Sequence, residues 1–168
     1  MPPFISRSRI AVVELYGTMG GALKSPLYVR IFTDLQKDRR TRAVVLDIDS
    51  PGGSVMASDY LYRSVSKVAQ NRPVVTFIRG MGASGGYLVG CPAHKIEAQP
   101  ASLVGSIGVI SVRPVLEALL QRLGVSVNVQ KSGSLKDMGA FWKSPTDEES
   151  QRLQAIVDHY YDSFVSAV

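Results

Sequence analysis

The amino-acid sequence predicts an α/β fold with a mainly parallel sheet and flanking helices. Three observations support this prediction. Short apolar, β-branched runs alternate with segments of helical periodicity. The run at 43–49 is apolar almost throughout, as in a strand covered on both faces. Two glycine-rich turns, at 50–54 and 80–87, each follow a strand and precede a helix. The 168 residues suffice for a core of their own, so we expect one domain over 1–168.

The first half of the chain supplies most of these elements. Ser25 and Pro26 are typical of a helix start, with Ser25 as N-cap and Pro26 at the first helical position. Leu27, Ile31 and Leu35 then recur at helical spacing. The predicted strands are 9–17, 43–49 and 73–79, and the second predicted helix is 54–70.

The second half carries weaker patterns. Thr146 to Glu149 form a capping-box pattern that starts a long final helix. Apolar residues follow at i, i+3 and i+4 spacing as far as Val165. Between these parts we expect strands at 94–98, 107–111 and 125–130, a helix at 113–123 and a polar loop at 131–141.

The two ends of the chain lack expected signals. The helical pattern still runs at Val168, so we expect the natural domain to continue beyond it. The sequence has neither a secretory signal nor an apolar run of about 18 residues. We therefore expect this chain itself to be soluble, with any membrane anchor outside it.

Composition argues against several classes of function. The formal net charge is +5, but apart from a cluster at 37–42 the basic residues are scattered, and no aromatic ladder accompanies them. We therefore expect no nucleic-acid partner. Cys91 is the single cysteine and lacks the spacing of a metal ligand, so neither a disulfide nor a metal is expected.

Ser84 is the candidate nucleophile, because it lies between glycines at the end of a predicted strand. Glycines allow a tight turn and a close approach of a substrate backbone. A helix that starts behind the serine would offer free N–H groups to an oxyanion.

The general base is less clear from the residues. The two histidines, His94 and His159, lie in contexts that do not mark either as a base, so we do not expect a Ser-His-Asp triad. The loop at 131–137 holds Lys131 and Lys136, and a lysine can replace histidine when it is neutral. Asp137 directly follows Lys136, which suggests an ordinary salt bridge and counts against Lys136.

Four motifs stand out along the chain: Asp-Ser-Pro-Gly-Gly at 49–53, Gly-Ala-Ser-Gly-Gly-Tyr at 82–87, Gly-Ser-Ile-Gly-Val-Ile at 105–110 and Lys-Ser-Gly-Ser-Leu-Lys-Asp at 131–137. Together they resemble the signal peptide peptidase A family of serine–lysine peptidases. They occur in the order and spacing of that family, over nearly the whole chain. The resemblance implies a Clp protease/crotonase-like fold of repeated ββα units.

The resemblance also implies a role for each site residue. Ser84 corresponds to the nucleophile, Lys136 to the general base and Ser106 to a hydroxyl that orients the lysine amine. Gly53 corresponds to a backbone donor of the oxyanion hole, with the Gly85 N–H as the natural second donor. No metal or cofactor takes part in the chemistry that the family implies.

The family implies an endopeptidase for apolar, extended peptides such as cleaved signal peptides. It also implies a homo-oligomer, and a membrane-associated full-length protein that works at the membrane surface. Two alternatives stay open: a crotonase-type acyl-CoA enzyme that works through carboxylates, and a catalytically idle assembly or binding module of the same fold.

Overall fold

The computed structural model describes residues 8–168, which divide into two compact units. The first comprises the described residues up to Gly108 together with Phe164–Val168, and the second comprises Val109–Ser163. The final helix, α5, belongs to both in part.

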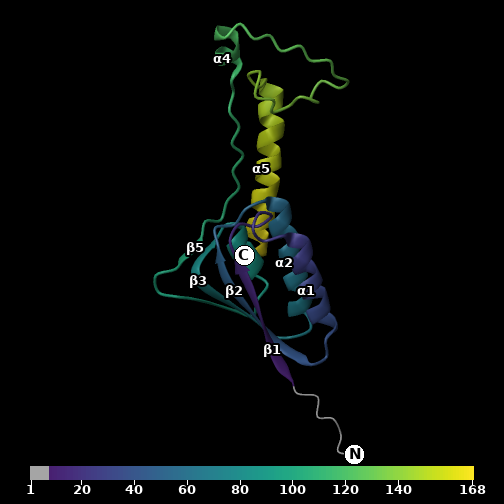
Figure 1. Cartoon of the computed structure of the whole chain (residues 1–168), viewed down its shortest axis with the longest axis vertical. Coiled ribbons are helices and arrows are strands. Elements are labelled where there is room, and N and C mark those ends of the chain that lie inside the picture. The colour runs from purple at the N-terminus through teal and green to yellow at the C-terminus, as the bar shows by residue number, and fades with distance from the viewer. Residues whose placement is uncertain (1–7) are drawn as a thin grey trace, which may run out of the picture. The chain divides into compact units, whose positions relative to one another are not determined.

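The first unit is a parallel five-stranded sheet with helices packed on one face (Figure 1). The strands follow the order β1-β2-β3-β4, and β5 pairs with β3 beyond the end of β4. The strands are β1 (Arg9–Tyr16), β2 (Thr41–Ser50), β3 (Val74–Ala83), β4 (Lys95–Ala98) and β5 (Leu103–Gly105). The helices are α1 (Ser25–Lys37), α2 (Val55–Ala69) and α3 (Gly85–Gly90).

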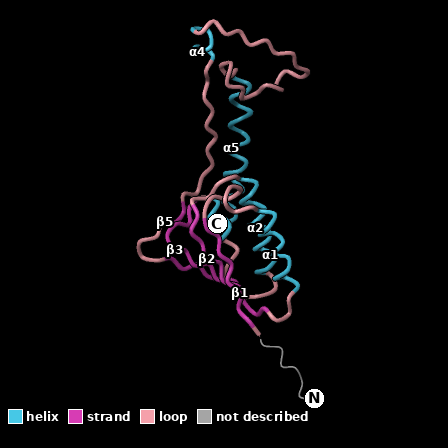
Figure 2. The backbone as a smooth tube through the Cα atoms, in the orientation of Figure 1, coloured by secondary structure: helices cyan, strands magenta, loops and turns pink. Residues whose placement is uncertain are grey.

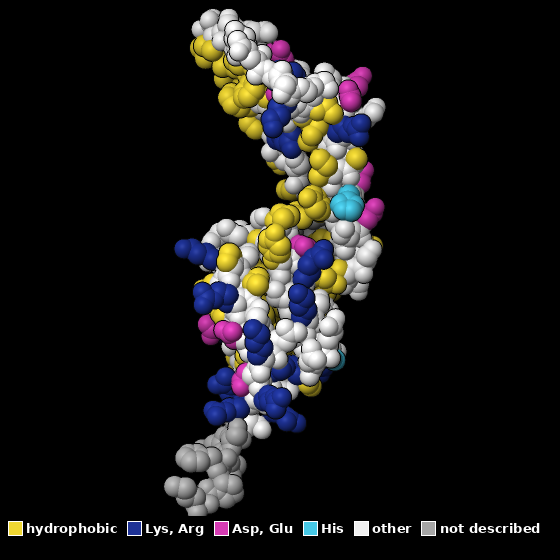
Figure 3. All heavy atoms as spheres, turned by 90° about the vertical axis from the view of Figure 1, so that its right-hand side faces the viewer, with side chains coloured by type: hydrophobic (Ala, Val, Ile, Leu, Met, Phe, Trp, Pro, Cys, Tyr) yellow, Lys and Arg dark blue, Asp and Glu magenta, His cyan; other side chains and the backbone are white. Residues whose placement is uncertain are grey.

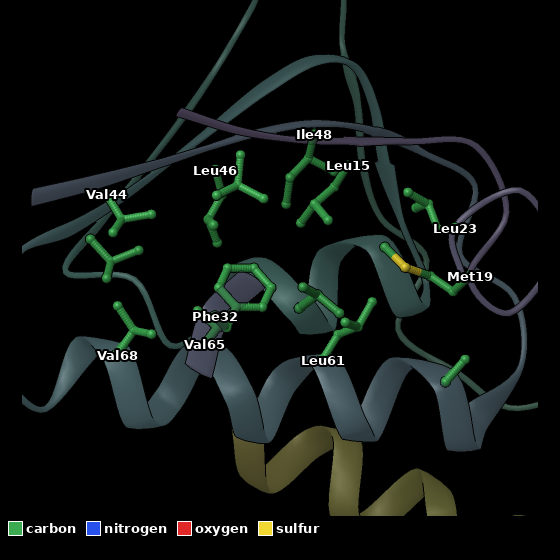
Figure 4. Close-up of a cluster of buried hydrophobic side chains, with 14 residues drawn as sticks. Leu15, Met19, Leu23, Phe32, Val44, Leu46, Ile48, Leu61, Val65 and Val68 are labelled. Atoms are coloured by element: carbon green, nitrogen blue, oxygen red, sulfur yellow. The ribbon is translucent and has the colours of Figure 1, made fainter. Parts of the chain in front are cut away.

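A sheet with this sequential order places its crossover helices on one side, because parallel crossovers share one hand. Figure 2 shows α1 and α2 on the same side of the strands. The core lies between these helices and the sheet, where Phe32 meets Leu46 from β2 and Leu61 and Val65 from α2 (Figure 4). All four side chains are at most 1% exposed. The opposite face of β1 is open, and Ile10 and Val12 there are 66% and 62% exposed.

The second unit consists of two helices and long loops. They are α4 (Glu117–Arg122) and the residues of α5 (Asp147–Ala167) up to Ser163. The predicted capping box starts α5: the Glu149 N–H donates to Thr146 Oγ1 at 3.2 Å, and the Thr146 N–H donates to Glu149 Oε2 at 3.1 Å. Near α4, the Leu116 N–H donates to the Phe141 carbonyl at 2.6 Å.

Four predictions about the elements were wrong in whole or in part. Neither 107–111 nor 125–130 forms a strand, although both lie in the described part of the chain; the strand of the first region is β5, four residues earlier. The helix expected at 113–123 is reduced to Glu117–Arg122. Ser25 is the first residue of α1 rather than its N-cap, which is Lys24.

Figure 3 shows Lys and Arg scattered over one face, interspersed with acidic and apolar side chains. Within residues 8–168, no helix is long and apolar enough to cross a lipid bilayer.

Candidate active site

Ser84 lies between β3 and α3 in an unusual backbone conformation. Its φ is 50° and its ψ is −124°, a region that non-glycine residues rarely adopt. Hydrogen bonds hold it there: its N–H donates to the Gly105 carbonyl at 2.8 Å, and its carbonyl accepts from the Leu88 N–H at 3.0 Å. The turn therefore fixes where the Ser84 side chain leaves the backbone.

The turn at residues 50–54 packs directly against the nucleophile turn. Gly52 has a φ of +94°, and a Cβ atom there would lie 2.7 Å from the Gly85 nitrogen and 2.8 Å from Ser84 Cβ. No side chain fits this space. Ser50 anchors the turn, since its hydroxyl donates to the Gly17 carbonyl at 2.6 Å and accepts from the Gly52 N–H at 3.2 Å.

Gly53 presents a free backbone N–H beside this contact. It forms a parallel bridge with Met19, in which the Met19 N–H donates to the Gly52 carbonyl and the Ser54 N–H donates to the Met19 carbonyl. In this pattern the Gly53 N–H points away from Met19, and no described residue accepts from it. The Gly85 N–H, at the first position of α3, also lacks an acceptor among the described residues.

Ser106 leaves the sheet beside Ser84. β5 pairs with the end of β3, with Ala83 opposite Gly105, so both serines directly follow paired residues of neighbouring parallel strands. Both also have positive φ values, 50° for Ser84 and 53° for Ser106. The structure thus brings Ser84, Ser106, Gly53 and Gly85 to the carboxyl ends of the strands in the first unit.

Lys136 lies in the second unit, in the loop that precedes α5. It is exposed, and its amine makes no ion pair or hydrogen bond with described residues of that unit. The expected salt bridge between Lys136 and Asp137 was wrong. Asp137 Oδ1 instead pairs with Lys131 Nζ at 2.6 Å and with Lys143 Nζ at 3.1 Å. The pairing of Lys136 with Ser84 stays a prediction.

His94 lies at the wrong end of the sheet to serve Ser84 of the same chain. Its Nδ1 accepts from the N–H of Val74, the first residue of β3, at 3.1 Å. Ser84 follows the last residue of this ten-residue strand, and such a strand spans roughly 30 Å. His159 is exposed on α5, and its ring lies 5.8 Å from that of Tyr160.

Two carboxylates in the second half of β2, those of Asp47 and Asp49, already accept hydrogen bonds. Asp47 accepts from the Tyr16 hydroxyl at 2.7 Å and pairs with the Arg79 guanidinium. The hydrogen bond from Arg79 holds the pKa of Asp47 below its usual value, despite burial. Asp49 Oδ1 accepts from the Met81 N–H at 2.9 Å. Asp47 is engaged on both oxygens, whereas Asp49 is exposed and is engaged through Oδ1.

Sequence reasoning missed the residues that hold the site together. Asp49 caps the Met81 N–H where the register between β2 and β3 shifts, from Ile48 opposite Ile78 to Ser50 opposite Gly82. The side chain of Ser50, which is fully buried, ties two loops. The only sequence signal for either role is their place immediately before Pro51-Gly52-Gly53.

No group of three or more His, Cys, Asp or Glu side chains in residues 8–168 is arranged to hold a metal ion. The thiol of Cys91 is half-buried, and this burial raises its pKa to about 11. It donates to the Tyr87 carbonyl at 3.2 Å, so it acts as a packing residue of α3.

Two family models match the chain. The model of Clp protease matches residues 13–103, and the model of peptidase family S49 matches residues 66–168. The chain belongs to peptidase family S49. This confirms the family expected from the four motifs.

Several relatives are similar to this chain in sequence. A candidate protease of Methanocaldococcus jannaschii is 40% identical to this chain, and the match covers 84% of this chain and 45% of the relative. A candidate signal peptide peptidase of Enterococcus faecium is 36% identical over 80% of this chain and 39% of its own. The chain therefore spans about half the length of these relatives.

The S49 chain is also similar to a solved structure. A serine-to-alanine variant of the membrane-bound stomatin-specific protease 1510-N superposes with a TM-score of 0.53, over 95% of this chain and 64% of that one. The identity is 16%, so this likeness concerns the fold alone. Together with the Clp protease match, it confirms the expected fold class.

Proposed function

We propose that this chain is the catalytic part of a serine endopeptidase in which Ser84 is the nucleophile and Lys136 the general base. The observation that carries the proposal is the turn at Ser84, which is locked beside the unpaired N–H groups of Gly53 and Gly85. Membership of family S49 supports a peptide substrate.

The chemistry follows from these groups. Neutral Lys136 removes the Ser84 proton as Oγ attacks the peptide carbonyl carbon, and the Gly53 and Gly85 N–H groups hold the oxyanion that forms. When this intermediate collapses, the lysine gives its proton to the departing amine. Water then attacks the acyl-enzyme with Lys136 again as base, and the acid is released as Ser84 regains its proton.

We propose that Ser106 assists the lysine. A hydroxyl beside the nucleophile accepts a hydrogen bond from an amine and so orients its lone pair toward Ser84 without adding charge. Its position directly after β5, opposite Ser84, supports this role.

The natural substrates we propose are apolar, extended peptides such as cleaved signal peptides. We further propose that the full-length protein is a membrane-associated homo-oligomer. A candidate signal peptide peptidase among the relatives supports the substrate class. The proposed peptidase domain covers residues 1–168.

Cleavage of a fluorogenic peptide with small apolar residues, at alkaline pH and in the full-length protein, tests the proposal. We expect Ser84→Ala and Lys136→Ala each to lose at least about 10³-fold in kcat/KM. Ser64→Ala is the matched serine control, because Ser64 donates only to the Tyr60 carbonyl within α2. Lys131→Ala is the lysine control and should still cleave at this pH.

Each contrary outcome points to a different base or to a different function. Full activity of Lys136→Ala would mean that another group is the base. An inactive wild type that binds a CoA thioester would favour the acyl-CoA enzyme. An inactive wild type without such binding would favour an idle assembly module.

A further inference from the structure

Four charged side chains of the second unit form a continuous chain, which we call the charge chain: Lys131, Asp137, Lys143 and Glu149. Lys131 Nζ and Lys143 Nζ both donate to Asp137 Oδ1, at 2.6 and 3.1 Å. Lys143 also pairs with Glu149 Oε1. The two carboxylates are shielded, with side chains only 10% and 3% exposed for Asp137 and Glu149.

The charge chain is electrically balanced, with two ammonium groups for two carboxylates. The hydrogen bond from Lys131, followed by that from Lys143, holds the pKa of Asp137 below its usual value. Glu149 is occupied on both oxygens, because Oε1 meets Lys143 and Oε2 accepts from the Thr146 N–H at 3.1 Å. Lys131 is further fixed by donating to the Ser134 carbonyl at 2.8 Å.

This arrangement bears on Lys136, the residue directly before Asp137. A carboxylate near an amine favours the ammonium form, which cannot accept a proton from a serine. We propose that Lys131 and Lys143 are positioning residues that keep Asp137 paired, so that the amine of Lys136 stays unpaired and available as a base. This inference rests on the proposed Ser84–Lys136 function.

The other charges near the motif, within the second unit, do not compete for this role. Leu135 and Met138, on either side of Lys136 and Asp137, line a cavity of about 440 Å³ that contains no acidic side chain and whose ionisable basic members are Arg152 and His159, together with Tyr160. Glu149, the one other acid of the charge chain, is held by Lys143 and Thr146. Asp137 is therefore the acid whose release would affect Lys136.

The test is the pH dependence of kcat/KM for the same peptide in the full-length protein. In Lys131→Met and in Lys143→Met, Asp137 loses one partner, and we expect the profile to move to higher pH by about one unit. Adding Asp137→Asn to either variant should return the profile to that of the wild type. Lys131→Arg, which keeps the charge, should leave it unchanged.

A purely structural role would lower activity at every pH without moving the profile, and that outcome would overturn the inference. So would a Lys131→Met shift that persists after Asp137→Asn is added. If either methionine variant fails to fold, Lys131→Gln or Lys143→Gln replaces it, and a profile that does not move to higher pH would overturn the inference. Failure of the proposed function would be recognised separately, because cleavage by the protein would then not require Ser84 and Lys136.

Discussion

Ser84 and Ser106 both adopt a left-handed φ that costs non-glycine residues free energy, about 1–3 kcal/mol each. Their hydrogen-bonded surroundings impose it: the Ser84 N–H is bound to the carbonyl of Gly105, the residue before Ser106. This hydrogen bond therefore links the two strained turns directly.

The Gly52→Ala variant tests how tightly the nucleophile turn is packed. A Cβ atom at residue 52 would lie 2.9 Å or less from backbone atoms of Ala83 and Gly85, which cannot rotate away. We expect a loss of about 2–4 kcal/mol in the free energy of unfolding and at least a 100-fold fall in kcat/KM. Urea unfolding and peptide cleavage measure the two effects.

Gly124→Ala is the matched control. Gly124 also has a positive φ, +68°, but a Cβ atom there would meet nothing within 4 Å. It should lose only about 1 kcal/mol of stability, from backbone strain, with its activity intact. If Gly52→Ala behaves like Gly124→Ala, the contact between the two turns has no catalytic importance.

At the scale of elements, the sequence predicts strands well where an apolar run finds a partner. The runs at 9–17 and 43–49 become β1 and β2, because each lies against a neighbour with a covering helix. The run at 125–130 alternates as a strand should, but none of its residues pairs with another strand in the described chain. Alternation reports a suitable surface, whereas pairing depends on residues far away in the sequence.

β3 shows the converse. Its apolar run ends near Arg79, yet the strand continues to Ala83, because β5 pairs with Met81–Ala83 and Asp49 binds the Met81 N–H. Both partners lie more than 20 residues away. The charge chain could not be predicted from the sequence either. Asp137 is adjacent to Lys136 in the sequence, but the fold of the loop pairs it with Lys131 and Lys143.

The start of α5 offers a prediction about a single element. Thr146→Ala removes the hydroxyl that accepts from the Glu149 N–H, which should destabilise the first turn of α5 by about 1 kcal/mol. Amide hydrogen exchange at residues 147–150 should quicken accordingly. Thr33→Ala is the control, since that hydroxyl only donates to the Val29 carbonyl of its own helix. Unchanged exchange in Thr146→Ala would show that the cap is not formed in solution.

At the scale of the whole molecule, the proposed reaction draws on both units. Ser84, Ser106 and the oxyanion donors belong to the first unit, and Lys136 and the charge chain belong to the second. The sequence supplied this assignment through four motifs in family order. The local geometry of the first unit supports this assignment, and kinetic measurements test whether the residues of the two units act together.

The pH dependence of cleavage is the prediction that joins them. A lysine base must be neutral, so kcat/KM should fall about tenfold per pH unit as the pH drops below the point where Lys136 gains its proton. A profile that stays flat down to pH 5 would argue against a lysine base. An inflection near pH 6.5 that persists in the Lys136→Ala variant would indicate a histidine instead.

Acid unfolding can be separated from this loss of activity. The Thr41 hydroxyl, the Arg40 N–H and the Arg9 guanidinium hold the pKa of Asp38 at about 2, below its ordinary value of 3.8. The stability contributed by such a lowered carboxyl is present above pH 4 and is lost as the pH falls toward 2. The other lowered carboxyls, Asp47, Asp137, Glu117 and Glu149, act in the same direction. We therefore expect the far-UV circular dichroism to be unchanged at pH 5, where cleavage has already been lost. If signal and activity decline together, the pH profile reports unfolding and carries no information about Lys136.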